Sequence, residues 1–338
     1  MGSNKDKKSM GTRNHPFIVF AAVVALGAVV YGAATAYPVE RTVEDEVRLA
    51  PSRTSLLGEL PRRKPAPISF VSVDNVEGLQ RAFEKADFRL APIRRGNQGV
   101  PRVMLAALPD DYHMIGQVDV RKRLFFKTML PLVLRVNEEI VAERRRLVGL
   151  ITILEAGHDL KPADREWIER LAERYRTNPG EFATLLRRVD AVSPGLAIAQ
   201  SIEESGWGRS RFARNGNALF GQRVWSEGAG LVPQARADGE TFEVRVFEHL
   251  IDSVRAYALN LNRHPAYADY RVERARQRAT EVALDPYALA QTLVGYSERR
   301  EQYVETLQSI IRSNRLELAR LKPRLFSTQP TIEVSSSR

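Results

Sequence analysis

The spacing of apolar residues along the chain predicts a mainly helical protein. After residue 118, apolar side chains recur near helical spacing over a long stretch, at Leu124, Met129, Val133, Val136 and Ile140. Pro131 lies inside this stretch. Because proline lacks a backbone N–H and its ring clashes with the preceding turn, we expect it to kink the helix or split it in two.

Further helices are expected downstream. Residues 162–176 and 180–190 are amphipathic, and the first of these segments carries an apolar face of Trp167, Ile168, Leu171 and Tyr175. Ser193-Pro194 is then a helix-start signal, with serine as the N-cap and proline at the first helical position, and Gly206 supplies the stop. These signals predict a helix of about three turns.

One short β-hairpin interrupts the helical pattern. Asp238-Gly239 is a favourable two-residue turn between residues 232–237 and residues 241–247. The sequence therefore predicts a mainly α fold of the α+β class, in which a helical domain at residues 106–322 carries a short hairpin.

The regions on either side of this domain have a different pattern. Residues 38–105 contain the proline-rich run P-R-R-K-P-A-P, which predicts an extended linker. Ile68–Val73 and Phe88–Ile93 are candidate short strands of a small ordered insert within it. The polar residues 323–338 predict a disordered tail.

An uncharged apolar run of 21 residues occupies positions 17–37, which is long enough to cross a bilayer as one helix. Residues 1–16 before it are basic, and this bias places them in the cytoplasm and the rest of the chain in the periplasm. Ala34-Thr35-Ala36 offers an alternative, a signal-peptide cleavage site. We favour an uncleaved anchor in the inner membrane, because the run exceeds the usual signal-peptide core of about 7–15 residues.

Composition narrows the chemistry of this chain of 338 residues. It has no cysteine, which excludes thiolate metal ligands and cysteine nucleophiles, and its five histidines show no metal-binding spacing, so no metal or cofactor is expected. The net charge of +10 raises the possibility of a nucleic-acid partner. However, the arginines alternate with glutamates along amphipathic helices, and we therefore expect no nucleic-acid binding.

The candidate chemistry lies at the end of the predicted three-turn helix, where Glu203 and Glu204 occupy the last turn. A carboxylate at this position faces the negative end of the helix dipole, and Trp207 and Phe220 are apolar neighbours that could shield it. Both effects favour the protonated form, which a glycosidase needs to protonate a leaving glycosidic oxygen. Two solvated glutamates are the alternative interpretation of the spacing alone.

The order of residues 200–221 resembles a known family. E-S-G-W-G-R-S, a short basic segment and N-A-L-F-G closely resemble the glucosaminidase family of the lysozyme-like superfamily, a group of peptidoglycan hydrolases. Segments 247–257 and 295–304 are similar to later helices of that family. Residues 231–237 and 264–267 are most similar to its Bax-type branch. The resemblance covers residues 167–316, about half the chain, and implies a lysozyme-like fold.

The resemblance also implies site residues. The family's catalytic glutamate, which precedes S-G-W-G, falls on Glu204, and a late tyrosine near the acid falls on Tyr296. The motif implied to bind substrate comprises Ser205, Trp207, Asn217, Phe220 and Gly221. On the helix, Glu204 shares one side with Ala197, Gln200 and Ser201, whereas Glu203 lies on another. The small and polar Glu204 side suits a wall that a sugar approaches.

A second carboxylate is less evident. In relatives it lies in a β-hairpin some tens of residues after the first, which here makes Asp238, Glu240 and Glu243 candidates. A turn-forming aspartate and solvated glutamates are the competing interpretations. Cleavage after N-acetylglucosamine can instead use the acetamido oxygen of the substrate as the nucleophile, which requires only one acid from the protein.

These observations lead to one functional hypothesis and two alternatives. The hypothesis is a membrane-anchored, periplasmic hydrolase that cuts the β-1,4 bond after N-acetylglucosamine in peptidoglycan, with Glu204 as general acid and Tyr296 assisting. The bond that is cut comes from the resemblance. The alternatives are an inactive glycan-binding or scaffold module of the cell envelope, and a lytic transglycosylase.

Overall fold

The computed structural model describes residue 65, residues 67–234, residue 236, residues 239–280, residues 283–316 and residue 325. The predicted membrane helix at 17–37, the basic segment before it and most of the predicted tail lie outside this range. Among the described residues, none of the helices combines the length and apolar character that a membrane span requires.

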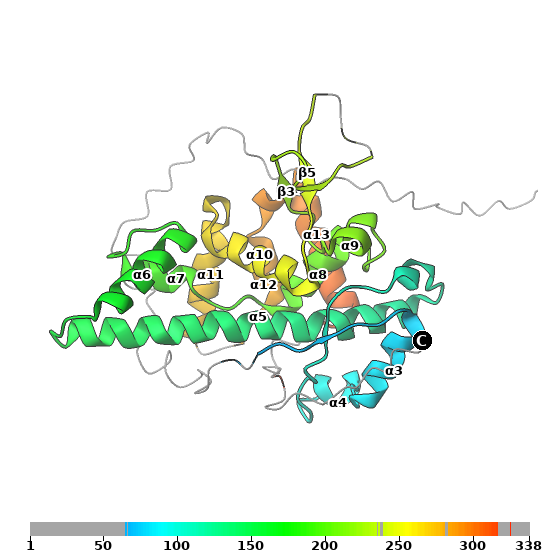
Figure 1. The fold of residues 1–338 in the computed structure, drawn as a ribbon, viewed down its shortest axis with the longest axis horizontal. Coiled ribbons are helices and arrows are strands. Elements are labelled where there is room, and N and C mark those ends of the chain that lie inside the picture. The colour runs from blue at the N-terminus through cyan, green and yellow to red at the C-terminus, as the bar shows by residue number, and fades with distance from the viewer. Residues whose placement is uncertain are drawn as a thin grey trace, which may run out of the picture.

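The long helix α5 (Val118–Glu155) runs through the whole fold (Figure 1). It continues unbroken through Pro131, so the expected split into two helices does not occur. The flanking residues Leu130, Leu132 and Val133 are fully buried. Burial of these three side chains, at about 1.5–3 kcal/mol each, outweighs the roughly 3 kcal/mol that an internal proline costs.

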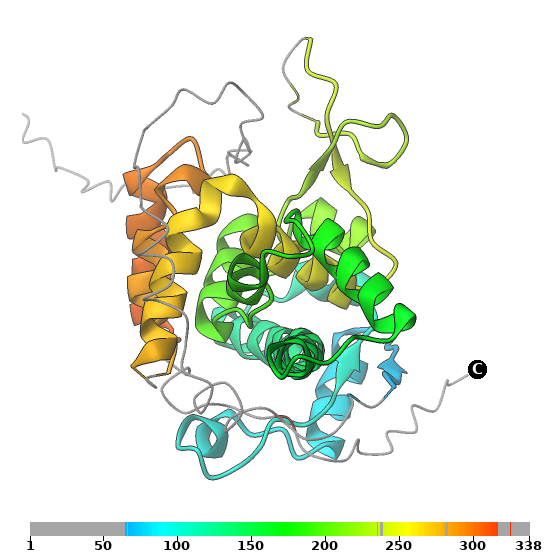
Figure 2. The same ribbon diagram turned by 90° about the vertical axis from the view of Figure 1, so that its left-hand side faces the viewer.

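Shorter helices pack around α5, as the view along this helix shows (Figure 2). Helix α8 (Pro194–Ser205) contacts α5, α12 and α13. Helix α10 (Leu250–Arg263) also lies against α5. The remaining helices of this layer are α6 (Pro162–Tyr175), α7 (Phe182–Arg188), α9 (Arg211–Gly216), α11 (Ala268–Ala279), α12 (Pro286–Gln291) and α13 (Glu301–Ser313). Helices α6 and α7 confirm the two amphipathic segments predicted before α8.

Within the described part of the chain, three short 3₁₀ segments connect the helices. They are η1 (Asp110–Met114), η2 (Pro265–Tyr267) and η3 (Val294–Tyr296). Turn η3 leads into α13, the helix that packs most extensively against α8. The architecture is therefore mainly α, as predicted, with the candidate helix α8 held inside it.

The region predicted as an extended linker is folded in its described part. It contains α3 (Val76–Lys85) and α4 (Leu90–Arg94), with β1 (Phe70–Val71) paired in parallel to β2 (Met104–Leu105). Strand β1 lies within the predicted strand 68–73. The strand predicted at 88–93 is wrong, because most of it forms α4, whose first turn accommodates Pro92 without losing a helical hydrogen bond.

Helix α3 joins the same hydrophobic core as α5. Leu79 and Phe83 are fully buried in it. Leu325, within the predicted disordered tail, forms an isolated parallel bridge with Val100. The domain thus begins well before the predicted boundary at residue 106.

A small three-stranded sheet projects from the helical body (Figures 1 and 2). Its strands are β3 (Arg223–Val224), β4 (Gly230–Leu231) and β5 (Glu243–Arg245), in the antiparallel order β3-β5-β4. Strand β5 lies in the predicted second arm of the hairpin. The predicted first arm at 232–237 is wrong, because the partner strand is β4, and the sequence did not reveal β3.

Strand β4 approaches β5 so closely that only glycine fits at residue 230. A Cβ atom there would lie 2.2 Å from the carbonyl oxygen of Val244. The connection from β4 to β5 spans residues 232–242, which is longer than the two-residue turn that Asp238-Gly239 predicted. The close pairing, rather than that turn, sets the register.

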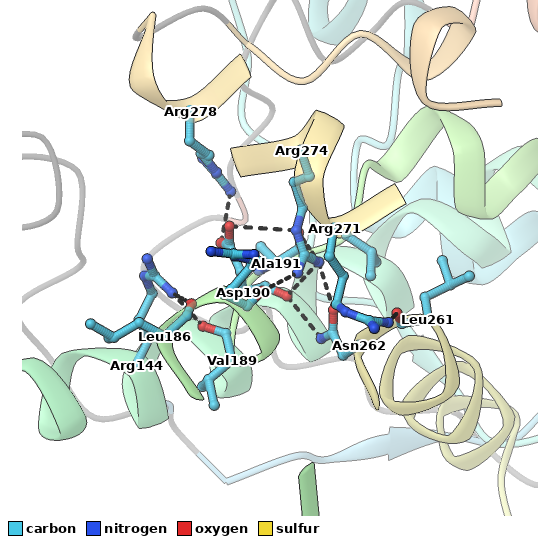
Figure 3. Close-up of polar contacts among 12 residues, drawn as sticks. Arg144, Leu186, Val189, Asp190, Ala191, Leu261, Asn262, Arg271, Arg274 and Arg278 are labelled. Atoms are coloured by element: carbon cyan, nitrogen blue, oxygen red, sulfur yellow. Dashed lines mark hydrogen bonds and ion pairs between the residues drawn. The ribbon is translucent and has the colours of Figure 1, made fainter. Parts of the chain in front are cut away.

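Asp190 lies buried just before α8, where it organises the segment that leads into this helix (Figure 3). The Nε of buried Arg274 is 3.5 Å from its Oδ2, and Nη2 of Arg278 is 3.3 Å from its Oδ1. Arg144 of α5 donates to the carbonyl of Val189 at 2.8 Å. Helices α5 and α11 are thereby tied to the start of α8.

The charges around Asp190 control its ionisation. Burial alone would raise the pKa of Asp190, but the guanidinium groups of Arg278, Arg144 and Arg274 lower that pKa to about 2. Asp190 is therefore a permanent buried anion at ordinary pH.

Candidate active site

Helix α8 ends as its sequence predicts. The Ser193 side chain accepts from the Leu196 amide at its start, Pro194 is the first helical residue, and Gly206 ends it in the left-handed conformation with φ of 57°. A left-handed residue of this kind is ordinarily glycine. Glu203 and Glu204 therefore occupy the last turn, as expected.

The two glutamates face different partners. Glu203 forms an ion pair with Arg299, whereas Oε1 of Glu204 accepts a hydrogen bond from the Tyr303 hydroxyl at 3.1 Å. Both residues have intermediate solvent exposure. The prediction that they lie on separate helix faces is confirmed, and only Glu204 is without a cationic partner at hydrogen-bonding distance among the described residues.

A chain of hydrogen bonds runs through the protein interior to Glu204. The Tyr257 hydroxyl donates to Oε1 of Gln200 at 2.7 Å, and Nε2 of Gln200 donates to the Tyr303 hydroxyl oxygen at 3.0 Å. Tyr303 then donates to Glu204. Helices α8, α10 and α13 each contribute to this chain, which we call the tyrosine relay.

Aromatic stacking fixes the relay. The ring of Tyr303 stacks on Tyr296, with centroids 5.4 Å apart and planes inclined by 6°. Tyr257 stacks on Phe220 at 4.1 Å. Tyr296, the tyrosine carried over from the family, thus lies behind Tyr303, and Tyr303 is the one that bonds the acid.

Sequence reasoning missed Tyr303 although it lies in the matched segment 295–304. Both tyrosines occur in this segment. The signal that could have distinguished them was the position of each relative to the helix that follows. Tyr303 is inside α13, the helix that faces α8, whereas Tyr296 is in the turn before it.

The surroundings of Glu204 favour its protonated form. Burial of the carboxyl raises the pKa of Glu204 to about 7, the Tyr303 hydrogen bond and the Arg299 charge oppose this rise, and the Glu203 charge adds to it. A large fraction of the molecules therefore carries a protonated Glu204 at neutral pH. This is the raised pKa that the sequence predicted, and the hydroxyl that bonds the carboxyl is that of Tyr303.

The helix face that carries Glu204 is covered rather than open. Ala197, Gln200 and Ser201 are fully buried. The expectation that this side forms a wall approached by sugar is wrong, since the neighbouring helices pack on it. Only its last residue, Glu204, reaches solvent.

Ser205 and Trp207 surround the end of α8. Ser205 is fully buried, and its hydroxyl bonds the Ser201 carbonyl and accepts from the Gly208 amide at 2.9 Å. Trp207 packs edge-on against Phe125 of α5 at 5.9 Å. The structure uses both side chains to hold the turn after the acid.

Asn217, Phe220 and Gly221 lie in the loop after α9. The Asn217 amide donates to the carbonyls of Phe247 and Glu248 at 3.1 and 3.0 Å, which ties this loop to the start of α10. Phe220 is buried against Tyr257. Gly221 lies closest to the acid, because a Cβ on it would be 3.6 Å from Oε2 of Glu204.

The three candidates for a second carboxylate differ in position. Asp238 lies outside the described residues, and Glu240 is exposed. Glu243 is buried in β5, where its two oxygens accept from the amides of Gly228 and Gly230 at 3.0 and 2.7 Å. Glu243 therefore braces the loop between β3 and β4. Within the described ranges, no group of three or more His, Asp or Glu side chains could hold a metal ion.

A carboxyl whose pKa is raised to about 7 meets the requirement for the general acid of a glycosidase. Comparison with known proteins agrees with this class. The glucosaminidase family model, described as mannosyl-glycoprotein endo-beta-N-acetylglucosaminidase, matches residues 180–316. Protein bax of Escherichia coli is 32% identical over 200 residues, which cover 57% of this chain and 70% of the relative.

The chain therefore belongs to the glucosaminidase family of lysozyme-like peptidoglycan hydrolases. Among solved structures, the catalytic domain of the autolysin Auto from Listeria monocytogenes is 18% identical. That match covers 49% of this chain and 93% of the other, with a TM-score of 0.30.

Proposed function

We propose that the protein is a membrane-anchored hydrolase that cleaves the β-1,4 bond after N-acetylglucosamine in peptidoglycan, with Glu204 as general acid. The observation that carries this proposal is the Glu204 carboxyl at the end of α8, whose burial raises its pKa to about 7 and keeps a proton available at neutral pH, in a residue that is not fully covered. Family membership supports the substrate class. The uncharged run at 17–37 supports the anchor and the periplasmic location.

The proposed reaction needs one protein acid. Glu204 transfers its proton to the glycosidic oxygen as the C1–O bond breaks, and the substrate's acetamido oxygen bonds C1 in its place. The resulting Glu204 carboxylate then takes a proton from the water that opens this intermediate. The structural use of Glu243 and the exposure of Glu240 favour this substrate-assisted route. Asp238 as a dedicated base is the alternative within the same hydrolysis.

Product analysis tests the proposal. Purified protein is incubated with sacculi, and the released muropeptides are identified by mass spectrometry after borohydride reduction. Reduced N-acetylglucosamine ends are expected. Anhydro-muramyl ends would instead identify a transglycosylase, and binding to sacculi without release would identify a scaffold module.

The pH dependence of hydrolysis should change when Tyr303 is replaced. Replacing Tyr303 with phenylalanine removes a hydrogen bond that lowers the pKa of Glu204, so this pKa should rise further above its ordinary value. Because the general acid works only when protonated, the alkaline limb of kcat/KM should move to higher pH, by about half to one unit. Profiles measured on soluble glycan strands check this, and a limb that stays in place or moves to lower pH would contradict the hydrogen bond's role.

A further inference from the structure

The hydrogen bonds of the tyrosine relay all donate in one direction, toward Glu204, because the amide of its central residue, Gln200, has one accepting and one donating end. The Oε1 atom of Gln200 can only accept and its Nε2 can only donate. The Tyr257 hydroxyl lies 2.7 Å from Oε1 and must therefore be the donor. Nε2 then donates to the Tyr303 oxygen, which leaves the hydrogen of that hydroxyl for Oε1 of Glu204.

We propose that Gln200 and Tyr257 are positioning residues that fix Tyr303 as a donor to Oε1 of Glu204 and thereby place the acidic proton on Oε2. This inference rests on the proposed function of Glu204 as general acid. It assigns separate tasks to the two oxygens of one carboxyl: Oε1 is held by the protein, and Oε2 delivers the proton.

The surroundings of Oε2 suit this task. Gly221 borders it, since a Cβ built there would lie 3.6 Å from Oε2, and this residue has no side chain and a φ of 58°. A glycosidic oxygen can approach a backbone that carries no Cβ more closely than any other residue would allow. The proton is thereby placed on Oε2, which lies beside Gly221, rather than on Oε1, which is bonded by Tyr303.

The opposite direction of the relay would disable the acid. With the Gln200 amide reversed, Tyr303 would donate to Gln200 and accept from a protonated Oε1 of Glu204. The proton would then be held between two protein oxygens, away from Gly221. The ionised form of Glu204 disfavours this reversal, because its Oε1 can then only accept, so Tyr303 must donate to it and the reversed amide would place a second acceptor against the Tyr303 oxygen.

Burial makes the direction difficult to change. Gln200, Tyr257 and Tyr303 are each at most 1% exposed. An amide or hydroxyl that loses its partner in such a place is left without water to replace it. The relay therefore has to keep every bond, which holds all three side chains in one arrangement.

The charges around Glu204 remain the same in the variants that test the relay. Glu203 and Arg299 lie beside it from α8 and the segment before α13, and Tyr267 and Tyr296 face it from η2 and η3. None of these groups is altered by Tyr257→Phe or Gln200→Met. A shift of the alkaline limb of kcat/KM in those variants is therefore caused by the loss of relay hydrogen bonds and not by a changed charge.

The experiment is a double-mutant cycle on the alkaline limb of kcat/KM. Tyr257→Phe and Gln200→Met should each move the limb to higher pH by about half to one unit, in the direction expected for Tyr303→Phe. Combined with Tyr303→Phe, neither should move it further, because the last bond of the relay is already gone. The inference would be overturned if the active single variants kept the alkaline limb of kcat/KM at the wild-type pH. It would also be overturned if the pH shifts of the single variants added up in the double variants.

A matched control separates the relay from general loosening. Tyr175→Phe also removes a buried hydroxyl that bonds a carboxylate, Glu143, at 3.5 Å, but on α6. The alkaline limb of kcat/KM of the Tyr175→Phe variant should stay at the wild-type pH even if the midpoint of its thermal unfolding falls. Should Gln200→Met fail to fold, Tyr257→Phe, which lacks one oxygen atom, carries the test. If Tyr257→Phe is active and its alkaline limb is unmoved, the relay inference is refuted but the proposed function is not. If Glu204→Gln is active, the proposed function itself is refuted.

Discussion

Replacing Glu204 with glutamine should reduce peptidoglycan hydrolysis by about 10²–10⁴-fold or more, since a general acid contributes that much to the rate. Glutamine keeps the shape of the side chain and can still accept from Tyr303, but it has no acidic proton. Binding to sacculi should therefore persist while release of muropeptides falls to background. Full activity of the variant on sacculi would sink the assignment.

Glu203→Gln is the matched control, because it makes the same change one residue earlier. Glu203 pairs with Arg299 and contributes a negative charge that raises the pKa of Glu204. Its loss should leave most of the activity and move the alkaline limb slightly to lower pH. A loss as large as that of Glu204→Gln would mean that the two glutamates share one role.

The same substitution at Glu204 should stabilise the protein at alkaline pH. The folded pKa of about 7 lies above the ordinary 4.5, so the stability that this group supplies is complete below about 4.5 and is lost as pH rises through 7. Glutamine does not ionise and avoids that loss, which is on the order of 3 kcal/mol. Thermal melts at pH 8–9 should show it, so inactivity could not be ascribed to unfolding.

Replacing Asp190 with asparagine should destabilise the fold by about 3–5 kcal/mol at pH 7, because it leaves buried Arg274 and Arg144 without their counter-charge. Denaturant unfolding measures this directly. The folded pKa of about 2 lies below the ordinary 3.8, so the wild-type advantage is present above about pH 4 and is lost as pH falls through 2. The difference in stability between the two proteins should therefore shrink by roughly 2 kcal/mol near pH 2.

An exposed carboxylate provides the control for Asp190. Glu77 is paired with Arg81 on α3, and its side chain is 76% exposed. Glu77→Gln should change the free energy of unfolding by less than about 1 kcal/mol. A cost for Asp190→Asn that is no larger than this would show that the buried arginines find other partners.

Local sequence signals were sufficient for the helix that carries the acid. Ser193, Pro194 and Gly206 act through bonds and dihedral angles within a few residues, so their effect can be read without the rest of the fold. The same helix shows what such signals omit. Periodicity placed Gln200 on the Glu204 side, but it could not say that α13 covers that side and brings Tyr303 to the carboxyl.

The errors outside the site have related causes. Composition predicted a linker before residue 106, but the apolar spacing of Leu79 and Phe83 was the better guide, because a helix needs only one apolar face to join a core. The strands of the small sheet have only two or three residues each, too few for alternation to be detected. Their register depends on the contact between Gly230 and Val244, which no local pattern encodes.

The position of α5 has a consequence for how the segment that matches the family model can be inherited or transplanted. The family match begins at residue 180, yet α8 and α10 both rest on α5, which ends at Glu155. A gene fusion or graft that carried only residues 180–316 would leave these helices with a bare apolar flank where Leu132 and Val133 are now buried. The unit that recombination can move intact therefore includes the long helix α5, on which α8 and α10 pack.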